Sequence, residues 1–404
     1  MRAYVVASGL RIAPWGDPVA EVPIGGVPLG ARQEALLRRF GLDVVHVARL
    51  DEVPTDEPRL VTFDHVYYSR RVLKSALSRW KKAGQVASRL ALPVGSTFVQ
   101  RFSALQDFER TAEHALFDLW LLPAGASATS AAPLPVIYAE RLLSWPVPPR
   151  ISGTATWVHP VTSSVVFHVR HWLHVLQASL LSIQIRWVDE VVAHPLWALS
   201  LLARAAIGRG RLAWRIGGVA NRYGRDVDVH PTARVEGSFL GDGVRVGPHA
   251  LVRGAIVGAG TVIEQAADVS YSVLGQRCFV SKHSLLWAIV AHDEAELCMK
   301  GMQMCLVGRG AALTARATPL DVMPGRALRV RDGDRFVEID VPVLGACFGH
   351  DTFVGADVYT GPGREVPNGT RIVPDPARVL SKLPADLDPT KLYVVRDGTL
   401  VALG

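Results

Sequence analysis

The stretch FLGDGVRVGPHALVRGAIVGAGTVIEQAADVSYSVLGQRCFV, residues 239–280, decides the fold of the second half of the chain. Aliphatic residues recur in it at steps of five or six, and the pattern closes every 17 residues, at Leu240, Val257 and Leu274, each followed by a glycine. A helix would repeat every 3.6 residues and a strand every two, so neither explains the pattern. It predicts the triangular coils of a left-handed parallel β-helix of hexapeptide repeats, with one aliphatic side chain per face in a stacked core.

The repeat begins at Val229 and pauses after Leu286. The segment Asp293–Met304 has a helical pattern. The segment Arg326–Val341 alternates on either side of an Asp-Gly-Asp turn, which is typical of a β-hairpin. We therefore expect a helix and a hairpin to be inserted into the β-helix at about residues 287–343.

Six-residue spacing resumes after the insertion. It runs through Phe348, Val354, Thr360, Val366 and Ile372. The segment Lys391–Leu403 then alternates around an Asp-Gly pair and predicts a closing hairpin. We place the all-β parallel β-helix at residues 227–380 and the hairpin tail at 381–404.

The first part of the chain alternates strand and helix patterns. The expected elements are a strand, a long loop, a helix, two strands and a helix: Ala3–Ala7, Ser8–Leu29, Ala31–Phe40, Asp43–Val47, Arg59–Phe63 and Arg70–Lys81. This order favours an α/β domain with a mostly parallel sheet, which we place at residues 1–150. Ligands of such sheets bind at the carboxyl ends of the strands, here at the Ser8–Leu29 loop and Asp64.

Two segments in this domain carry a resemblance to a known family. ASGLRIAPW (residues 7–15) and VPIGGVPLGARQEALLRRFGLD (residues 22–43) resemble the sugar-nucleotide pyrophosphorylases, nucleotidyltransferases of which many carry a C-terminal left-handed β-helix. The resemblance implies a divergent nucleotidyltransferase-like fold and a loop that wraps a triphosphate, fitted here by Gly9, Arg11, Ile12 and Pro14. It also implies a catalytic role for Arg11, nucleotide contact by Gln33, and Mg²⁺ bound at Asp64.

The sequence departs from this family at charged positions. The loop is shorter by about two residues and so offers fewer backbone N–H groups to a phosphate. The family's two lysines fall here near Val19 and at Val27, and no lysine precedes Lys74. Phosphoryl transfer depends on positioning and charge neutralisation, so we expect impaired transfer. The resemblance covers residues 1–93 and 229–379, and residues 95–224 do not align.

Residues 151–226 form a connecting segment. Its part His168–Ala206 is apolar and helical in pattern, with a break at Pro195, which predicts two helices docked between the domains. Six arginines follow with no acidic residue between Glu190 and Asp226: Arg204, Arg209, Arg211, Arg215, Arg222 and Arg225. An apolar helix followed by arginines also suits peripheral contact of residues 168–225 with an anionic membrane. No nucleic-acid-binding module is recognised, so no nucleic-acid partner is expected.

Hexapeptide-repeat acyltransferases are a second class of function to consider. They typically place a histidine general base between the coils of adjacent subunits. The first candidates are His350 and His292, each followed by an acidic residue, and His249 and His283 come after them. Six residues separate Cys298 from Cys305, a spacing that fits no compact zinc motif, so we expect them to fill apolar space.

Composition bounds these hypotheses. The chain has 404 residues, 49% of them hydrophobic, and a net charge of +7, which suits phosphate-bearing ligands or an anionic surface. Four cysteines are too few for a disulfide scaffold and favour a reducing compartment. The start MRAYVVASGL has no leader pattern, and the longest apolar stretches are too short to cross a bilayer. We expect a cytoplasmic protein that forms homo-oligomers through the β-helix.

Three functional hypotheses stay open at this point. The first is a divergent pyrophosphorylase-like protein that transfers a nucleotidyl group to a sugar 1-phosphate, or binds it. The second is an acyltransferase of the hexapeptide type. The third is a non-catalytic nucleotide-binding scaffold or regulator. Whether the chain is an enzyme is decided by the site and not by the fold.

Overall fold

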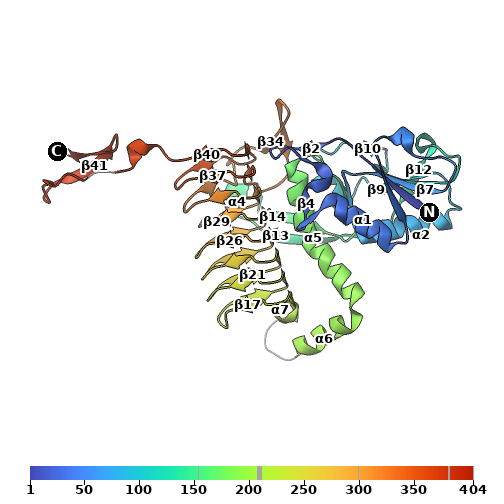
Figure 1. Ribbon diagram of the computed structural model, residues 1–404, viewed down its shortest axis with the longest axis horizontal. Helices are drawn as coiled ribbons and strands as arrows, with labels where there is room; N and C mark the ends of the chain where they lie inside the picture. Colours follow the sequence, from blue (N-terminus) through green and yellow to red (C-terminus); the bar gives the residue numbers. More distant parts are fainter. Residues whose placement is uncertain (153, 207–211, 299, 381–382, 404) are drawn as a thin grey trace.

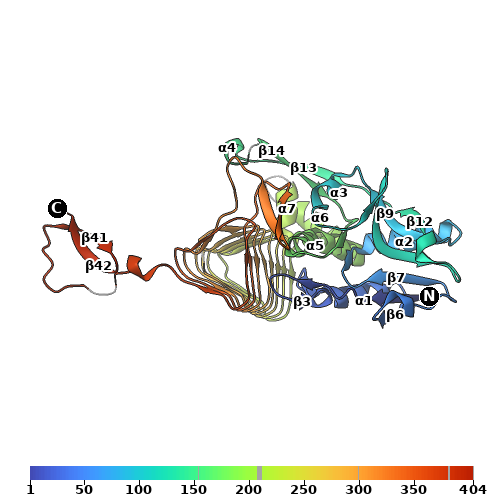
Figure 2. The same ribbon diagram turned by 90° about the horizontal axis from the view of Figure 1, so that it is seen from above.

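The computed structural model describes residues 1–152, 154–206, 212–298, 300–380 and 383–403. Figure 1 shows an α/β unit formed by the first part of the chain, beside a stack of coils formed by the second part, with helix α5 (Trp172–Ala193) between them. The predicted combination of an α/β domain with a parallel β-helix is confirmed. Figure 2 looks along the stack and shows its triangular outline.

A mixed sheet forms the centre of the α/β unit. Its strands lie in the order β12-β9-β11-β7-β1-β6, with β10 beside β11. As predicted, β1 runs parallel to β6 and β7, whereas β11 is antiparallel to β7 and β9. The bounds are β1 (Arg2–Val6), β6 (Asp43–Val47), β7 (Arg59–Phe63), β9 (Ser88–Pro93), β10 (Glu109–Arg110), β11 (His114–Leu122), β12 (Ala132–Pro135), α1 (Leu29–Arg39), α2 (Arg70–Lys82) and α3 (Thr97–Phe102).

Strand β1 is covered on both faces. Ala3 and Val5 belong to the main core, which includes α1 and α2, while Tyr4 and Val6 pack in a smaller cluster with Trp120. A strand buried on both sides reads as a continuous apolar run and not as an alternation. This is why the start of the chain was recognisable as a strand of a covered sheet.

The coils of the β-helix form three parallel faces. The first face contains β16 (Arg222–Tyr223), β19 (Phe239–Leu240), β22 (Ile256–Val257), β25 (Val273–Leu274), β28 (Val290–Ala291), β31 (Leu306–Val307), β36 (Cys347–Phe348) and β39 (Glu365–Val366). The second contains β17 (Asp228–Val229), β20 (Arg245–Val246), β23 (Val262–Ile263), β26 (Phe279–Val280), β29 (Glu296–Leu297), β32 (Ala312–Leu313), β37 (Phe353–Val354) and β40 (Arg371–Ile372). The third contains β18 (Arg234–Glu236), β21 (Leu251–Arg253), β24 (Asp268–Ser270), β27 (Leu285–Trp287) and β30 (Met302–Gln303), and continues with the pair β33 (Thr318–Pro319) and β38 (Tyr359–Thr360).

The helix predicted at Asp293–Met304 is wrong. The described residues of this segment contain strands β29 and β30, and the coils continue as far as β33. Ala291 pairs with Val307, 16 residues later, whereas Leu274 pairs with Ala291 after 17. One missing residue and a small alanine at an inward position interrupt the aliphatic spacing. The insertion is therefore shorter than the predicted 287–343 and begins only after β33.

The two predicted hairpins are confirmed. The first, β34 (Leu328–Asp332) with β35 (Arg335–Ile339), leaves the coils and lies against the start of α5, where His171 Nε2 is 2.8 Å from the carbonyl oxygen of Arg331. The second, β41 (Leu392–Arg396) with β42 (Thr399–Leu403), follows the short helix η4 (Pro376–Arg378). Figure 1 shows this C-terminal hairpin standing clear of the coils.

The connecting segment contains α5, α6 (Pro195–Ala206), α7 (Leu212–Val219), the hairpin β13 (Arg141–Pro146) with β14 (Thr156–Val161), and β15 (Val166–His168), which pairs with β8 (Val66–Tyr68). The first half of α5 is buried and packs against both the α/β unit and the coils, as a docking helix should.

On α6, Leu196 is 83% exposed, Leu199 64% and Leu202 52%. Among the described residues, no helix is both long and apolar enough to cross a membrane. Contact of this segment with a membrane surface stays a prediction.

Candidate functional site

The carboxyl end of the parallel strands presents Asp64, as the sequence predicted. This residue directly follows β7, and its carboxylate Oδ1 accepts a hydrogen bond of 2.9 Å from the backbone N–H of Ser8, directly beyond β1 and the intervening Ala7. Gln33, expected to contact a nucleotide, instead lies buried beneath this turn. Its amide donates to the carbonyls of Phe63 and Val66, at 2.9 and 2.6 Å. Gln33 therefore holds the turn that carries Asp64.

The loop expected to wrap a triphosphate is folded into short hairpins. These are β2 (Arg11–Ile12) with β3 (Asp17–Pro18), and β4 (Pro23–Ile24) with β5 (Val27–Pro28), joined by η1 (Val19–Glu21). Several backbone N–H groups are already bonded within the loop: Leu10 to Ser8 Oγ, Gly16 to Ile12 O and Val19 to Leu10 O. Arg11 is exposed and donates to the carbonyl of Gly16 at 2.6 Å. Gly9 adopts a φ of +70° and turns the chain into the first hairpin.

Arg11 and Asp64 are not joined. Among the described residues, the side chain of Arg11 bonds only Gly16 and the side chain of Asp64 bonds only Ser8. The loop groups that would converge on a phosphate are therefore engaged with other loop atoms.

The tip of the first hairpin is seated on the β-helix. Trp15 is 4% exposed, and its indole N–H donates to the carbonyl of Phe348 at 3.1 Å. The amide of Asn368 donates to the carbonyl of Trp15 at 2.8 Å. We call Trp15, Asp17, His292, His350 and Asn368 the Trp15 joint.

The two candidate histidines, His292 and His350, lie close together within this joint. Their ring centroids are 6.0 Å apart, and the Trp15 ring lies 4.9 Å from that of His292. His350 Nε2 is 2.8 Å from a carboxylate oxygen of Asp17, and its Nδ1 accepts the backbone N–H of Arg309, so Nε2 carries the proton. Burial lowers the pKa of His292 to about 3. Both rings are covered by the α/β unit, which leaves neither facing a free coil surface.

The cysteines fill the core of the coils, as predicted for Cys305. Cys278, Cys305 and Cys347 are buried, and burial raises the pKa of each of these thiols. None of the four forms a disulfide. Cys298 is partly exposed and lies directly after strand β29, not on a helix face. The structure therefore does not bring the cysteines to the two histidines as a metal site.

A groove lies between the α/β unit, α5 and the first coils. It has a volume of about 480 Å³ and is lined by the β4–β5 tip (Gly25 and Gly26), by Arg186, and by corner residues that include Gly241, Gly258 and Gly275. These are the glycines that follow the 17-residue aliphatic positions, and a Cβ on Gly258 would collide with the backbone of Gly275. A second hollow of about 510 Å³ lies at the base of the β34–β35 hairpin.

Arg186 is an exposed charged residue that lines this groove. Its guanidinium lies 4.3 Å from the centroid of the Phe239 ring and makes no hydrogen bond or ion pair among the described residues. Partial desolvation of the guanidinium by neighbouring groups lowers its pKa, with the charge of Glu190 opposing the shift. The two other charged residues that line the groove form ion pairs, Arg222 with Glu190 and Asp242 with Arg225.

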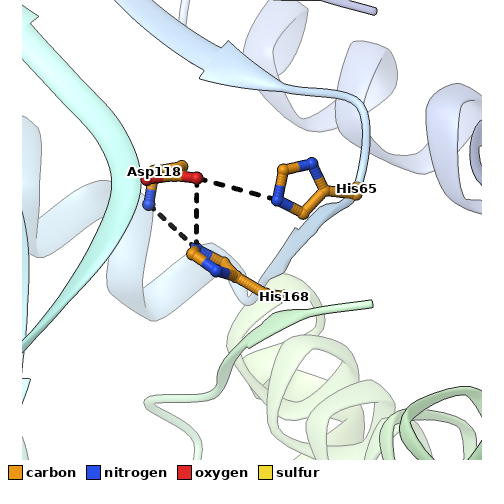
Figure 3. A group of neighbouring side chains, drawn as sticks. All are labelled: His65, Asp118 and His168. Carbon is orange, nitrogen blue, oxygen red and sulfur yellow. Dashed lines mark hydrogen bonds and ion pairs between the residues drawn. The ribbon is translucent and has the colours of Figure 1, made fainter. Parts of the chain in front are cut away.

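A third group of titratable residues was missed by sequence reasoning. His65, Asp118 and His168 offer ligand atoms that all lie within 4.8 Å of one another. Figure 3 shows the three side chains pointing toward each other from three separate segments. Roughly fifty residues separate each from the next in the chain, so no spacing motif announces them. The one available signal was the position of His65 next to Asp64, at the end of a strand.

Comparison with known proteins adds little to this picture. No protein-family model matches the sequence, and no curated protein matches it. A solved structure that the chain resembles is titled as the crystal structure of a hexapeptide transferase family protein from Anaplasma phagocytophilum, with 17% sequence identity and a TM-score of 0.20. The likeness covers 41% of this chain and 81% of that chain. Likeness at this level carries no conclusion about function, which is inferred below from the residues themselves.

Proposed function

We propose that this chain is a pyrophosphorylase-like protein that binds a nucleotide or sugar phosphate in the inter-domain groove and has lost efficient nucleotidyl transfer. The unpaired Arg186 in that groove is the observation that carries the proposal. Small-molecule sites of about 300–1,000 Å³ are common at domain interfaces, and the groove volume of about 480 Å³ falls in this range.

Charge explains why the ligand should be an anion. The Arg186 side chain is exposed at the groove, where it contacts the Phe239 ring and has no hydrogen-bond acceptor among the described residues. A phosphate oxygen would supply both hydrogen bonds and a countercharge, since the guanidinium fork matches phosphate geometry. Arg222 and Asp242 already form ion pairs with other residues. Arg186 is therefore the charged side chain of the groove that we expect to contact the ligand.

The state of the loop argues against efficient transfer. A phosphate cradle needs several free backbone N–H groups that point at the ligand. Here the loop uses such groups internally, and its hairpin tip is buried on the coils. The two family lysines are also replaced, near Val19 and at Val27. Mg²⁺ at Asp64 stays a prediction, and the binding experiment tests it by comparing titrations with and without Mg²⁺.

Isothermal titration of the full chain with nucleoside triphosphates, nucleoside diphosphate sugars and sugar 1-phosphates tests the proposal. We expect at least one of these ligands to bind saturably. Arg186→Gln should weaken binding by roughly 10- to 100-fold, because a hydrogen bond to a charged group contributes about 1.5–3 kcal/mol. Arg110→Gln is the matched control, since Arg110 also stacks on an aromatic ring, that of Phe108, but lies outside the groove.

Three results would overturn the proposal. The first is that no ligand of the panel binds, and the second is that Arg186→Gln binds as tightly as the unaltered chain. The third is release of pyrophosphate from a triphosphate and a sugar 1-phosphate that is abolished by Asp64→Ala, since this would establish transfer at the sheet edge.

Acyl transfer is the second candidate, and the pairing of His350 with Asp17 is the observation that bears on it. An acid–base histidine needs access to its substrate. His350 is 5% exposed and His292 4%, both beneath Trp15. We therefore expect no acyl-CoA consumption. Consumption that is lost in His350→Ala would reverse this conclusion.

A further inference from the structure

We propose that His65, Asp118 and His168 form a binding site for a zinc-type divalent ion inside the α/β unit. The proposal does not rest on the ligand groove, because none of the three residues lines it. It rests on the convergence of three ligand atoms, on an unsatisfied buried histidine, and on the support around a second histidine.

Three strands bring the ligand atoms together. His65 follows β7, Asp118 lies on β11 beside the end of β7, and His168 ends β15, which pairs with β8 just after His65. Asp118 sits where β11 changes register against β9, between Leu116 and Trp120. The topology therefore places two imidazoles and one carboxylate at the same carboxyl edge that carries Asp64.

The distances approach those of a metal site. Asp118 Oδ2 lies 3.7 Å from His65 Nε2 and 3.8 Å from His168 Nε2. A tetrahedral zinc ion with bonds of about 2.0–2.2 Å holds its ligands about 3.3–3.5 Å apart. A contraction of a few tenths of an ångström would thus bring these pairs into coordination. Two histidines and one carboxylate leave a further position for water or a ligand.

His65 is the strongest sign that something binds here. Its side chain is 6% exposed, and neither ring nitrogen has a hydrogen-bond partner among the described residues. Buried polar atoms in folded proteins are almost always satisfied, by protein, water or an ion. Burial, followed by the charges of His168 and Arg170, lowers the pKa of His65 to about 3. The ring is therefore neutral near pH 7 and keeps a lone pair for a metal.

His168 has the support that a metal-binding histidine usually has. Its Nδ1 is 3.0 Å from a carboxylate oxygen of Asp107, which fixes the proton on Nδ1 and directs the Nε2 lone pair toward Asp118. Burial lowers the pKa of His168 to about 4, with the charge of Asp118 opposing the shift. Nε2 accepts the backbone N–H of Asp118 at 3.0 Å, and a bound ion would replace this hydrogen bond.

Asp118 keeps one oxygen for the ion. Its Oδ1 accepts a hydrogen bond of 2.9 Å from Arg89, whereas Oδ2 faces the two imidazoles. The centroid of the Phe63 ring lies 5.6 Å from that of His65, and the centroid of the Phe117 ring lies 5.4 Å from that of His168. These two aromatic rings line the cluster. Two neutral imidazoles favour zinc and its neighbours over Mg²⁺, which prefers an all-oxygen shell.

Titration of the EDTA-treated full chain with Zn²⁺ tests the proposal. We expect one ion per chain and loss of binding in His65→Gln and in Asp118→Asn. Asp107→Asn keeps all three ligands and should weaken binding by about 10- to 100-fold. The matched control is His174→Gln, because His174 is also buried and neutral, with a pKa lowered to about 3, but is bonded to the carbonyl of Ala104. The control should bind zinc as the unaltered chain does.

X-ray absorption on the zinc-loaded, unaltered chain gives a readout that does not depend on the folding of any variant. A first shell of two imidazole nitrogens with oxygen supports the site. A shell of oxygen alone, or one with cysteine sulfur, would overturn it, as would binding that His65→Gln leaves unchanged. Failure of zinc binding would leave nucleotide binding through Arg186 untouched, and the reverse also holds, so the two proposals fail separately.

Discussion

At the scale of single residues, the Trp15 joint is where the two domains meet most specifically. The sequence singled out His292 and His350 as candidates, and the fold brings their rings together. The expected acidic partner of His350 was Asp351, its neighbour in the chain, whereas the observed partner is Asp17, 333 residues away. Chain adjacency could not reveal this contact, because it depends on how a loop of one domain docks on another.

Buried His292 should make folding sensitive to acid. Its pKa lies near 3 in the folded chain and near 6.5 when unfolded. The unfolded state therefore binds the extra proton between these values, and stability falls as the pH drops below about 6.5. At pH 5 the cost of this one group is roughly 2 kcal/mol, at about 1.4 kcal/mol per pH unit.

Urea unfolding at pH 7.5 and pH 5 checks this effect. Other buried histidines also titrate, so the comparison is between chains. His292→Gln should lose about 2 kcal/mol less stability on acidification than the unaltered chain. His230→Gln, at an exposed position, should behave as the unaltered chain does. Equal pH dependence of His292→Gln and the unaltered chain would show that His292 is solvated or charged in the fold.

At the scale of elements, the sequence predicted the coils whose aliphatic residues are regularly spaced, but not the coil that departs from this spacing. The coils with steps of five and six residues were recognised from aliphatic positions, and their strands pair in that register. The coil from Ala291 to Val307 was misread because it is one residue short and carries a small inward residue. The adjacent coils hold this short coil in register through backbone pairing. The sequence of a single coil does not reveal that pairing.

The β34–β35 hairpin depends on a close backbone approach at Gly363. This glycine has a φ of +68°, and a Cβ would collide with the carbonyl of Arg329 on the hairpin. Gly369 has a similar φ of +66° but open space around it. Alanine at either position costs roughly 1–2 kcal/mol for the left-handed backbone. Gly363→Ala should cost about 1–3 kcal/mol more, because the hairpin must move away.

Denaturant unfolding of the two alanine variants measures this difference. The Gly369→Ala variant serves as the internal reference for backbone strain alone. Equal destabilisation by both substitutions would mean that the hairpin does not press on the coil at Gly363.

At the scale of the whole molecule, the two fold types were predictable but their arrangement was not. Apolar patterning identified the sheet, the coils and the docking helix α5. The candidate metal cluster was hidden, because His65, Asp118 and His168 become neighbours only through strand pairing. The groove was hidden for the same reason, since its walls come from three parts of the chain. Oligomerisation through the coils stays a prediction.

We infer that the loop at residues 8–29 is a structural joint and not a mobile phosphate cradle. Hydrogen exchange followed by mass spectrometry tests it directly, because exchange reports local opening of hydrogen bonds. In the unaltered chain, residues 8–29 should exchange nearly as slowly as strand β1, and Trp15→Ala should speed exchange in the loop and around His350 while leaving β6 unchanged. Exchange of residues 8–29 within seconds in the unaltered chain, at the rate of a free loop, would show that the loop is mobile and not a structural joint.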